Sequence, residues 1–223
     1  MSKALVVLSG GQDSVTCLFW ALAKFEEVEA ITFKYGQRHE VELTCAKAVC
    51  RETGVPHKVL DMSFLGEIAT SALTGDGDVS AAHALNDKLP ASFVPNRNAL
   101  LLGAAHSYAQ TIGAEVLVTG VCQTDYSGYP DCREEFIMLL NTALDIGTAR
   151  EVKILTPLMY LTKAETFKLA DELGVLSTVI EMSHTCYEGD RSVRHQWGYG
   201  CGECPACGLR RAGYEEFWNG MKI

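Results

Sequence analysis

The chain has 223 residues, of which 48% are hydrophobic, and it carries a formal net charge of -9. Its length and apolar content suffice for a buried core, and its acidic balance disfavours broad contact with a nucleic-acid backbone, which clustered Lys and Arg provide. No stretch reaches the roughly 20 apolar residues that a bilayer span needs, and residues 1–8 are too short for the apolar part of a signal peptide. We therefore expect a cytoplasmic protein that acts on small molecules, with no membrane and no direct nucleic-acid partner.

Short apolar runs alternate with helix-compatible segments along most of the chain. Gly54, Gly113 and Gly174 follow predicted helices, where glycine commonly ends a helix, and Thr162 with Glu165 forms a capping box. This alternation requires crossover helices, so it predicts an α/β fold with a parallel sheet, helices on both faces and ligands at the carboxyl ends of the strands. The predicted strands are residues 4–8, 28–33, 57–60 and 115–119, and the predicted helices are 13–24, 38–53, 99–112, 131–146 and 163–173.

Two regions differ from this pattern. Residues 62–92 show poor periodicity and many Gly, Asp, Ser and Ala residues, which predicts a long loop or lid with little structure of its own. After Glu181 the composition changes to Gly, Cys, Arg and aromatic residues. We expect residues 1–180 to form the main unit and residues 181–223 a compact C-terminal region, both packed as one domain.

A glycine-rich loop joins the first predicted strand to the first predicted helix. It reads Ser9-Gly10-Gly11-Gln12-Asp13-Ser14, and the N–H groups at such a helix start favour an anion. The spacing matches neither G-x-x-x-x-G-K-[ST] nor G-x-G-x-x-G, which argues against γ-phosphate transfer and hydride transfer. The alternative is a plain glycine turn in which Asp13 or Ser14 caps the helix.

This loop resembles the PP-loop of N-type ATP pyrophosphatases, whose pattern S-G-G-x-D-S it matches at every specified position. The resemblance implies that the segment from Leu8 to Ser14 binds ATP and that pyrophosphate leaves as one group. The α-phosphate then stays open to attack by a substrate oxygen, and Asp13 helps to hold Mg²⁺, which prefers oxygen ligands.

The nine cysteines fall into two groups. Cys186 and the C-x-x-C-x-x-C run of Cys201, Cys204 and Cys207 supply four thiolates, the ligand set of a closed tetrahedral zinc site. An iron–sulfur cluster is the rival interpretation, and His184 or His195 is an alternative to Cys186 as ligand. The remaining five thiols, of Cys17, Cys45, Cys50, Cys122 and Cys132, are expected to pack as small apolar side chains. Of these, Cys122 and Cys132 lie in polar motifs.

Three further segments complete a family pattern. They are Tyr35-Gly-Gln-Arg-His39, Val94-Pro-Asn-Arg-Asn98 and Gly120-Val-Cys-Gln-Thr-Asp-Tyr-Ser-Gly-Tyr-Pro-Asp-Cys-Arg133. With the loop and the terminal cysteines, they resemble the 7-cyano-7-deazaguanine synthase family of queuosine biosynthesis from end to end. The resemblance implies a Rossmann-like fold of the adenine nucleotide alpha hydrolase type, a PP-loop domain over residues 1–180, zinc in the C-terminal region and a homodimer.

The resemblance also implies a reaction. An enzyme of this family joins 7-carboxy-7-deazaguanine to ammonia with ATP, passing through an adenylated acid and an amide to the nitrile. A carboxylate is a poor acyl donor, and adenylation gives it a good leaving group. Arg97 is suited to neutralise phosphate or carboxylate charge, and Lys163 to contact phosphate, with a plain surface lysine as the alternative.

The edge of a guanine-like base presents N–H donors, for which carboxylates are the natural acceptors. Asp125 and Asp131 are candidates, and Tyr126 and Tyr129 are candidates to stack on the ring. Asp131 is equally suited to cap the helix that follows it, and Asp125 equally suited to a turn. Gln37 is expected to line the nucleotide site, with a plain loop amide as the alternative.

Two features depart from the family pattern. Asn96 stands where the family has glycine, and asparagine tolerates the left-handed backbone conformation. The gap from Cys186 to Cys201 is longer than expected and inserts a basic, aromatic piece over residues 191–199. Three other functions stay open: an amide-forming relative that supplies a base for DNA, a tRNA-modifying PP-loop enzyme, which needs a basic surface, and a zinc interaction module.

Overall fold

The computed structural model describes residues 2–35, 40–68, 82–83, 86–90, 93–124 and 128–220. At its centre lies a five-stranded sheet in which every neighbouring pair of strands is parallel. The prediction of an α/β fold with a parallel sheet is confirmed. Across the sheet the strands follow the order β3 (His57–Asp61), β2 (Glu27–Lys34), β1 (Lys3–Val7), β6 (Val116–Val118) and β7 (Lys153–Leu155).

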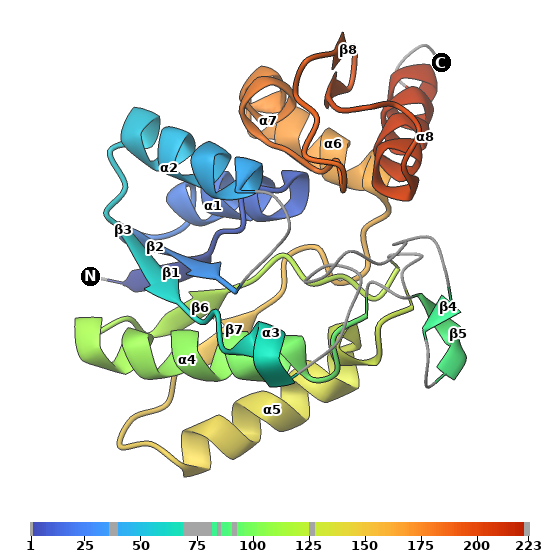
Figure 1. The fold of residues 1–223 in the computed structure, drawn as a ribbon. Coiled ribbons are helices and arrows are strands. Elements are labelled where there is room, and N and C mark those ends of the chain that lie inside the picture. The colour runs from blue at the N-terminus through green and yellow to red at the C-terminus, as the bar shows by residue number, and fades with distance from the viewer. Residues whose placement is uncertain are drawn as a thin grey trace.

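Helices cover both faces of this sheet (Figure 1). Successive strand residues point to opposite faces, so Leu5 and Val6 of β1 belong to different apolar clusters, and both side chains are fully buried. After Lys3 the central strand is therefore apolar, as expected for a strand that is covered on both faces. The helices α1 (Gln12–Leu22) and α2 (Val41–Thr53) cover one face, and α4 (Arg97–Ile112) and α5 (Glu134–Ile146) cover the other.

Several predicted helix ends are confirmed. Gly54 and Gly113 end α2 and α4 in the left-handed conformation, at φ 71° and 75°. The capping box of α6 (Lys163–Glu172) is present, because Glu165 N donates to Thr162 Oγ1 at 3.2 Å and Thr162 N donates to the Glu165 carboxylate at 2.8 Å. Asn96 has φ 56° and is the only non-glycine residue of positive φ in the described part of the chain.

The predicted helix over residues 131–146 begins later than expected. Residues Pro130–Cys132 form a single 3-10 turn, η1, and Arg133 is extended, so α5 starts at Glu134. Asp131 does not cap α5. Its carboxylate instead accepts a hydrogen bond at 2.9 Å from the backbone N–H of Asn98, in the first turn of α4. A tertiary contact has replaced the local cap that the spacing predicted.

The region over residues 62–92 has more structure than expected. Its described part contains a short helix and two antiparallel strands, and the rest of it lies outside the described residues. Strand β7 and two C-terminal helices were also not predicted from the sequence pattern. These elements are α3 (Leu65–Ile68), β4 (Ala82–His83), β5 (Asn86–Pro90), α7 (Leu176–Met182) and α8 (Pro205–Gly220).

The C-terminal elements lie together beyond one end of the sheet (Figure 1). Phe167 of α6 packs against Tyr214 and Phe217 of α8, with ring centroids 5.4 and 6.2 Å apart. A hairpin of β8 (Arg194–His195) and β9 (Gly198–Tyr199) occupies the inserted piece between Cys186 and Cys201. None of the helices in the described residues combines the length and the apolar character that a bilayer span requires.

Gly10 yields the first testable prediction. Its φ is 95°, and a Cβ at this position would lie 2.0 Å from the carbonyl oxygen of Glu42, whereas a Cβ on Gly54, also of positive φ, would meet nothing within 4 Å. Gly54→Ala should cost only about 1–2 kcal/mol of backbone strain. Gly10→Ala should cost clearly more, because backbone of the loop or of α2 must move. Urea denaturation of both variants checks this, and equal losses would contradict the close packing.

Candidate active site

The main cavity lies where the order of the strands reverses. From β1 the chain proceeds outward to β2 and β3 and later returns to the other side of β1 as β6 and β7. The segments after β1 and β6 thus diverge at the carboxyl edge of the sheet, the usual position of a ligand site in such folds. A cavity of about 350 Å³ opens there, and its walls include Ser9, Asp13, Thr119 and Gly120.

The residues from Leu8 to Ser14 are here called the phosphate loop. Hydrogen bonds of the two serine side chains of this loop fix its conformation. Ser14 Oγ accepts from Ser9 N at 3.2 Å and from Gly10 N at 3.1 Å, and it donates to Gly11 O at 3.0 Å. Gly11 N in turn donates to Ser9 Oγ at 3.1 Å. Among the described residues, no side chain caps the start of α1. The helix therefore offers its first N–H groups to an anion in the cavity.

Buried polar atoms without partners converge on this cavity. Within the described residues, the buried side-chain atoms that make no hydrogen bond are Gln12 Nε2, Asp13 Oδ1 and both ring nitrogens of His184. All three residues line the cavity. An unpaired buried polar group costs about 1–3 kcal/mol, and such groups are normally satisfied. A polar ligand that enters the cavity would satisfy them, which fits a nucleotide.

Lys163 and Asp13 form an ion pair across the cavity wall. Lys163 Nζ lies 2.6 Å from Asp13 Oδ2, and both side chains are largely buried. A Cβ on Gly213 of α8 would lie 2.4 Å from Lys163 Cβ, so the two backbones approach each other closely there. Lys163 is thus held beside the phosphate loop, and its contact with phosphate stays a prediction.

Arg97 and two tyrosines form the opposite wall. Arg97 is the first residue of α4, and its guanidinium lies 5.7 Å from the centre of the Tyr129 ring. Tyr35, at the end of β2, also lines the cavity, and burial raises the pKa of its hydroxyl. Asp131 is only 4% exposed and supports this wall from behind by holding Asn98. Its proposed contact with a substrate stays a prediction.

Glu42 is a site residue that the analysis of the sequence missed. It lies in the first turn of α2 and lines the cavity. Burial raises the pKa of Glu42 to about 7, although the positive charge of Arg97 acts in the opposite direction. A carboxyl group with a pKa near 7 is partly protonated at neutral pH, so it can accept or donate a proton in a reaction. No local motif marks Glu42, because its position depends on how α2 packs against the phosphate loop.

The four C-terminal cysteines converge as predicted. Their sulfur atoms all lie within 4.8 Å of one another, and the pairs Cys201–Cys207 and Cys186–Cys204 are each 3.9 Å apart. A tetrahedral zinc site with Zn–S bonds of about 2.3 Å spaces its sulfurs about 3.8 Å apart, so the cluster fits the ion. Burial acts to raise the pKa of Cys201, but N–H groups of Cys204 and Glu203 donate to its sulfur, and the net effect lowers that pKa to about 7.

The two histidines that were alternative zinc ligands, His184 and His195, make other contacts. His195 Nε2 lies 3.0 Å from Gly200 O, and its ring stacks on Trp197 at 4.4 Å, beside the cysteines. His184 faces the cavity instead. Burial, with the positive charges of Arg191 and Arg210, lowers the pKa of His184 to about 4, so its imidazole is neutral at neutral pH.

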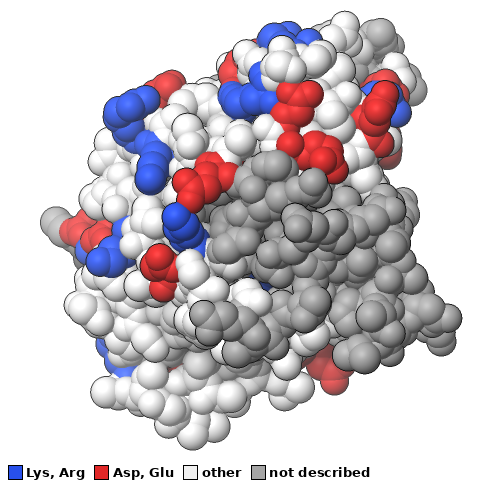
Figure 2. All heavy atoms as spheres, in the orientation of Figure 1, with Lys and Arg blue, Asp and Glu red and all other residues white. Residues whose placement is uncertain are grey.

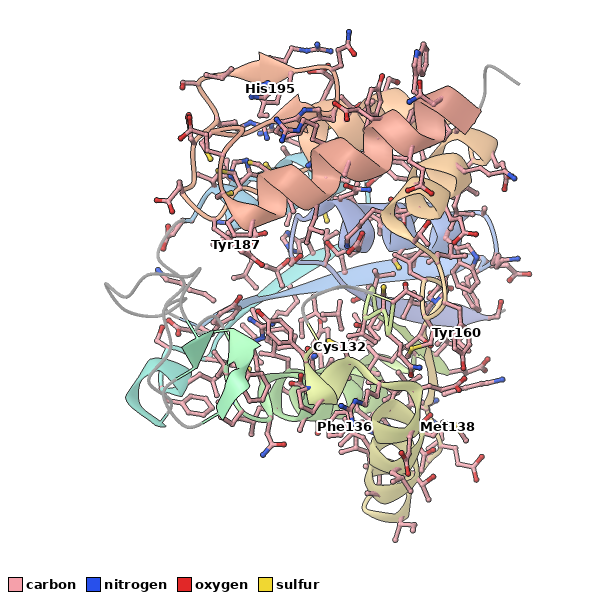
Figure 3. All side chains as sticks on the ribbon, turned by 90° about the vertical axis from the view of Figure 1, so that its right-hand side faces the viewer. Cys132, Phe136, Met138, Tyr160, Tyr187 and His195 are labelled. Atoms are coloured by element: carbon pink, nitrogen blue, oxygen red, sulfur yellow. The ribbon has the colours of Figure 1, made fainter. Side chains whose placement is uncertain are left out.

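One short segment connects the cysteines to the phosphate loop. His184 N donates to Gly10 O at 2.9 Å, Arg210 donates to Thr185 Oγ1 at 2.9 Å, and Cys186 follows directly. Arg210 belongs to α8, which also carries Cys207. Figure 3 shows the two walls of the site: Tyr187 lies beneath α8, and Cys132 lies at the start of α5, and both line the cavity.

Comparisons with known proteins identify the family. The family model described as "Queuosine biosynthesis protein QueC" matches residues 3–218. The chain belongs to the QueC family. Curated relatives named 7-cyano-7-deazaguanine synthase include those of Wolinella succinogenes, 51% identical over 97% of this chain and 94% of the relative, and Lysinibacillus sphaericus, 50% identical over 96% and 95%.

Solved structures show the same fold at low identity. A 4-thiouridine synthetase in complex with RNA and ATP matches with a TM-score of 0.51 and 21% identity, covering 80% of this chain and 42% of that one. A predicted subunit of a tRNA methyltransferase from Methanocaldococcus jannaschii matches with a TM-score of 0.50 and 18% identity, covering 77% and 76%. These similarities show that the QueC family chain shares its α/β fold with these proteins and carry nothing about its substrate.

Three predicted site residues of this QueC family member, Gln37, Asp125 and Tyr126, lie outside the described residues. The other thiols behave as expected: Cys17, Cys45, Cys50 and Cys122 are buried, and Cys132 is half-buried. On the face seen in Figure 2, the described Lys and Arg side chains lie among Asp and Glu side chains.

The raised pKa of Glu42 predicts a pH-dependent stability. An unfolded glutamate titrates near pH 4.5, whereas Glu42 in the folded chain keeps its proton up to about pH 7. The ligand-free protein should therefore lose stability as the pH rises through this range, because the unfolded state releases the proton first. Glu42→Gln does not titrate, so its stability relative to the unchanged protein should increase by on the order of 2 kcal/mol between pH 5 and pH 8.

Urea denaturation at the two pH values measures this difference. Glu40→Gln is the matched control, because the exposed Glu40 pairs with Lys34 at 2.6 Å and that hydrogen bond lowers the pKa of its carboxyl group. A relative stability of Glu42→Gln that stays constant with pH would contradict the assignment.

Proposed function

We propose that this chain is an ATP-dependent ligase that converts 7-carboxy-7-deazaguanine and ammonia into 7-cyano-7-deazaguanine. One observation carries the proposal: unpaired buried atoms of Gln12 and Asp13 face a cavity at the switch point of the sheet, in a chain about 50% identical over nearly its whole length to 7-cyano-7-deazaguanine synthases. The phosphate loop supplies the ATP site, and the remaining volume of the cavity receives the base.

The residues that line the cavity have different roles in the proposed reaction, according to their chemistry. The start of α1 and the glycines of the phosphate loop bind the phosphates that leave as pyrophosphate. Lys163 and Arg97 neutralise the charge that builds up at the α-phosphate and at the carboxylate. Tyr129 lies beside the Arg97 guanidinium and offers an aromatic face to the deazapurine ring. The first adenylation prepares the acid for ammonia, and the second removes the amide oxygen with AMP.

Two metals accompany this proposal. Asp13 Oδ1 is a buried, unpaired carboxylate oxygen beside the phosphate loop, which suits Mg²⁺ shared with phosphate oxygens. Mg²⁺ would supply charge neutralisation for the phosphates. Zn²⁺ would occupy the cluster of Cys186, Cys201, Cys204 and Cys207 and act structurally, because four thiolates leave no open position on the ion.

Other predictions keep their status. Gln37, Asp125 and Asp131 remain proposed contacts of nucleotide or base, and residues 1–180 and 181–223 remain the proposed units of one domain.

We also propose a homodimer. Helix α5 exposes three large apolar residues, Met138, Leu139 and Ile146, which are 63%, 64% and 82% exposed, and light scattering of the purified protein measures the oligomeric state.

Product analysis tests the proposed reaction. The zinc-loaded protein is incubated with 7-carboxy-7-deazaguanine, ammonium, Mg²⁺ and ATP, and the products are identified by mass spectrometry. The proposal predicts nitrile and AMP. Amide with AMP as the end product would indicate the amide-forming relative that supplies DNA modification, and absence of AMP would redirect the search to an RNA substrate.

A matched pair of lysines tests the assigned site. Lys163→Met should lower AMP formation by at least about a hundredfold, because it removes a positioned cation from the phosphates and leaves the Asp13 carboxylate without its partner. Lys168→Met, on the same helix with a side chain 68% exposed, should leave the rate unchanged. Zinc content should be the same in both variants. Equal rates would exclude Lys163 from the chemistry, and loss of zinc would show a structural role instead.

A further inference from the structure

His184 is a buried polar residue that has no assigned role in the proposed reaction. Its side chain is 1% exposed, and in the part of the chain that the structure describes neither ring nitrogen makes a hydrogen bond. The imidazole lies near the backbone of Cys186, but without the geometry of a hydrogen bond. A neutral imidazole has one donor and one acceptor, so both capacities are unsatisfied in the ligand-free protein.

The backbone fixes this side chain beside the phosphate loop. His184 N donates to Gly10 O at 2.9 Å, and a Cβ on Gly11 would lie only 3.6 Å from His184 O. The other buried atoms that lack partners in the described residues belong to Gln12 and Asp13, and they line the same cavity. A group that fills this part of the cavity therefore meets His184 together with the loop.

The surrounding charges favour an anion as that group. Arg191 and Arg210 flank His184 and hold the residues on either side of it: Arg191 donates to the backbone Ser183 O at 3.1 Å, and Arg210 donates to the Thr185 hydroxyl Oγ1 at 2.9 Å. Both guanidinium groups stay charged in proteins. Their positive potential reaches the part of the cavity beside His184. The N–H group of a neutral imidazole can donate a hydrogen bond to a phosphate oxygen.

We propose that His184 contacts the phosphate chain held by the phosphate loop, donating one ring N–H to an oxygen of the leaving pyrophosphate. This inference rests on the proposed function for the identity of the ligand. It adds a binding residue that lies far from the loop in sequence, in the segment that also carries the first cysteine of the cluster. The cost of leaving the imidazole unpaired in the empty protein is recovered when the nucleotide binds.

Titration calorimetry with magnesium pyrophosphate, on the zinc-loaded full chain and without the carboxylate substrate, tests the proposal. His184→Phe keeps a flat ring but removes both polar atoms, so it should weaken pyrophosphate and ATP binding by about tenfold or more. Adenosine binding should not change. His184→Asn or His184→Gln should restore part of the loss, because each places an amide N–H near one of the two ring nitrogens.

Stability separates this role from a structural one. His184→Phe should raise the melting temperature of the ligand-free protein, because it removes an unsatisfied buried group. His106→Phe is the matched control: His106 is equally buried and lies 3.0 Å from Asp145 on the far face of the sheet. That change should lower the melting temperature and leave pyrophosphate affinity intact.

Two outcomes would overturn the proposal. Unchanged pyrophosphate affinity in His184→Phe would show that a buried water satisfies the imidazole, and a loss confined to binding of 7-carboxy-7-deazaguanine would place the contact on the base. Neither result touches the proposed function. That function fails only if the unchanged protein binds no pyrophosphate or releases no AMP.

Discussion

The site depends on one constraint: the phosphate loop is enclosed by backbone. Gly10 faces the carbonyl of Glu42 at a distance that excludes a Cβ, and its own carbonyl accepts from His184 N. On another side, a Cβ on Gly120 would lie 3.1 Å from the backbone of Asp13. Three segments distant in sequence thus meet at a loop of seven residues. The loop keeps its N–H groups directed into the cavity because these neighbours pack closely around it.

The C-terminal region belongs to this enclosure. Its cysteine cluster fits zinc but offers the ion no open position, so we expect a structural role for it. Cys186 holds the segment that binds the phosphate loop, and Cys207 belongs to the helix whose Gly213 approaches Lys163. The inserted hairpin adds to the same unit, because Arg191 contacts Tyr199 of β9 at 4.3 Å and Cys45 of α2 at 3.3 Å. The insertion thereby connects α2 to the cysteine region.

Local patterns predicted most of the fold and about half of the site. The capping box of Thr162 and the left-handed Asn96 are determined within a few residues, and the structure confirms both. The four cysteines converge as their pattern predicted, whereas the binding of ATP by the phosphate loop stays a prediction. Of the two roles weighed for Asp131, the cap of α5 is wrong, because its partner Asn98 lies on another helix. Glu42 and His184 carry no motif. Their roles arise from packing between elements, and an orphaned buried atom becomes visible only in three dimensions.

Hydrogen exchange read by mass spectrometry tests the central claim most directly. It compares the nucleotide-free, zinc-loaded protein with the same protein after a chelator has removed the metal. If the cysteine region holds the phosphate loop, amides of the loop and of the segment 183–187 should lose protection together, whereas β2 and β3 should keep theirs. Exchange in the loop that stays unchanged after the zinc has left would show that the loop is stable on its own and would contradict the account.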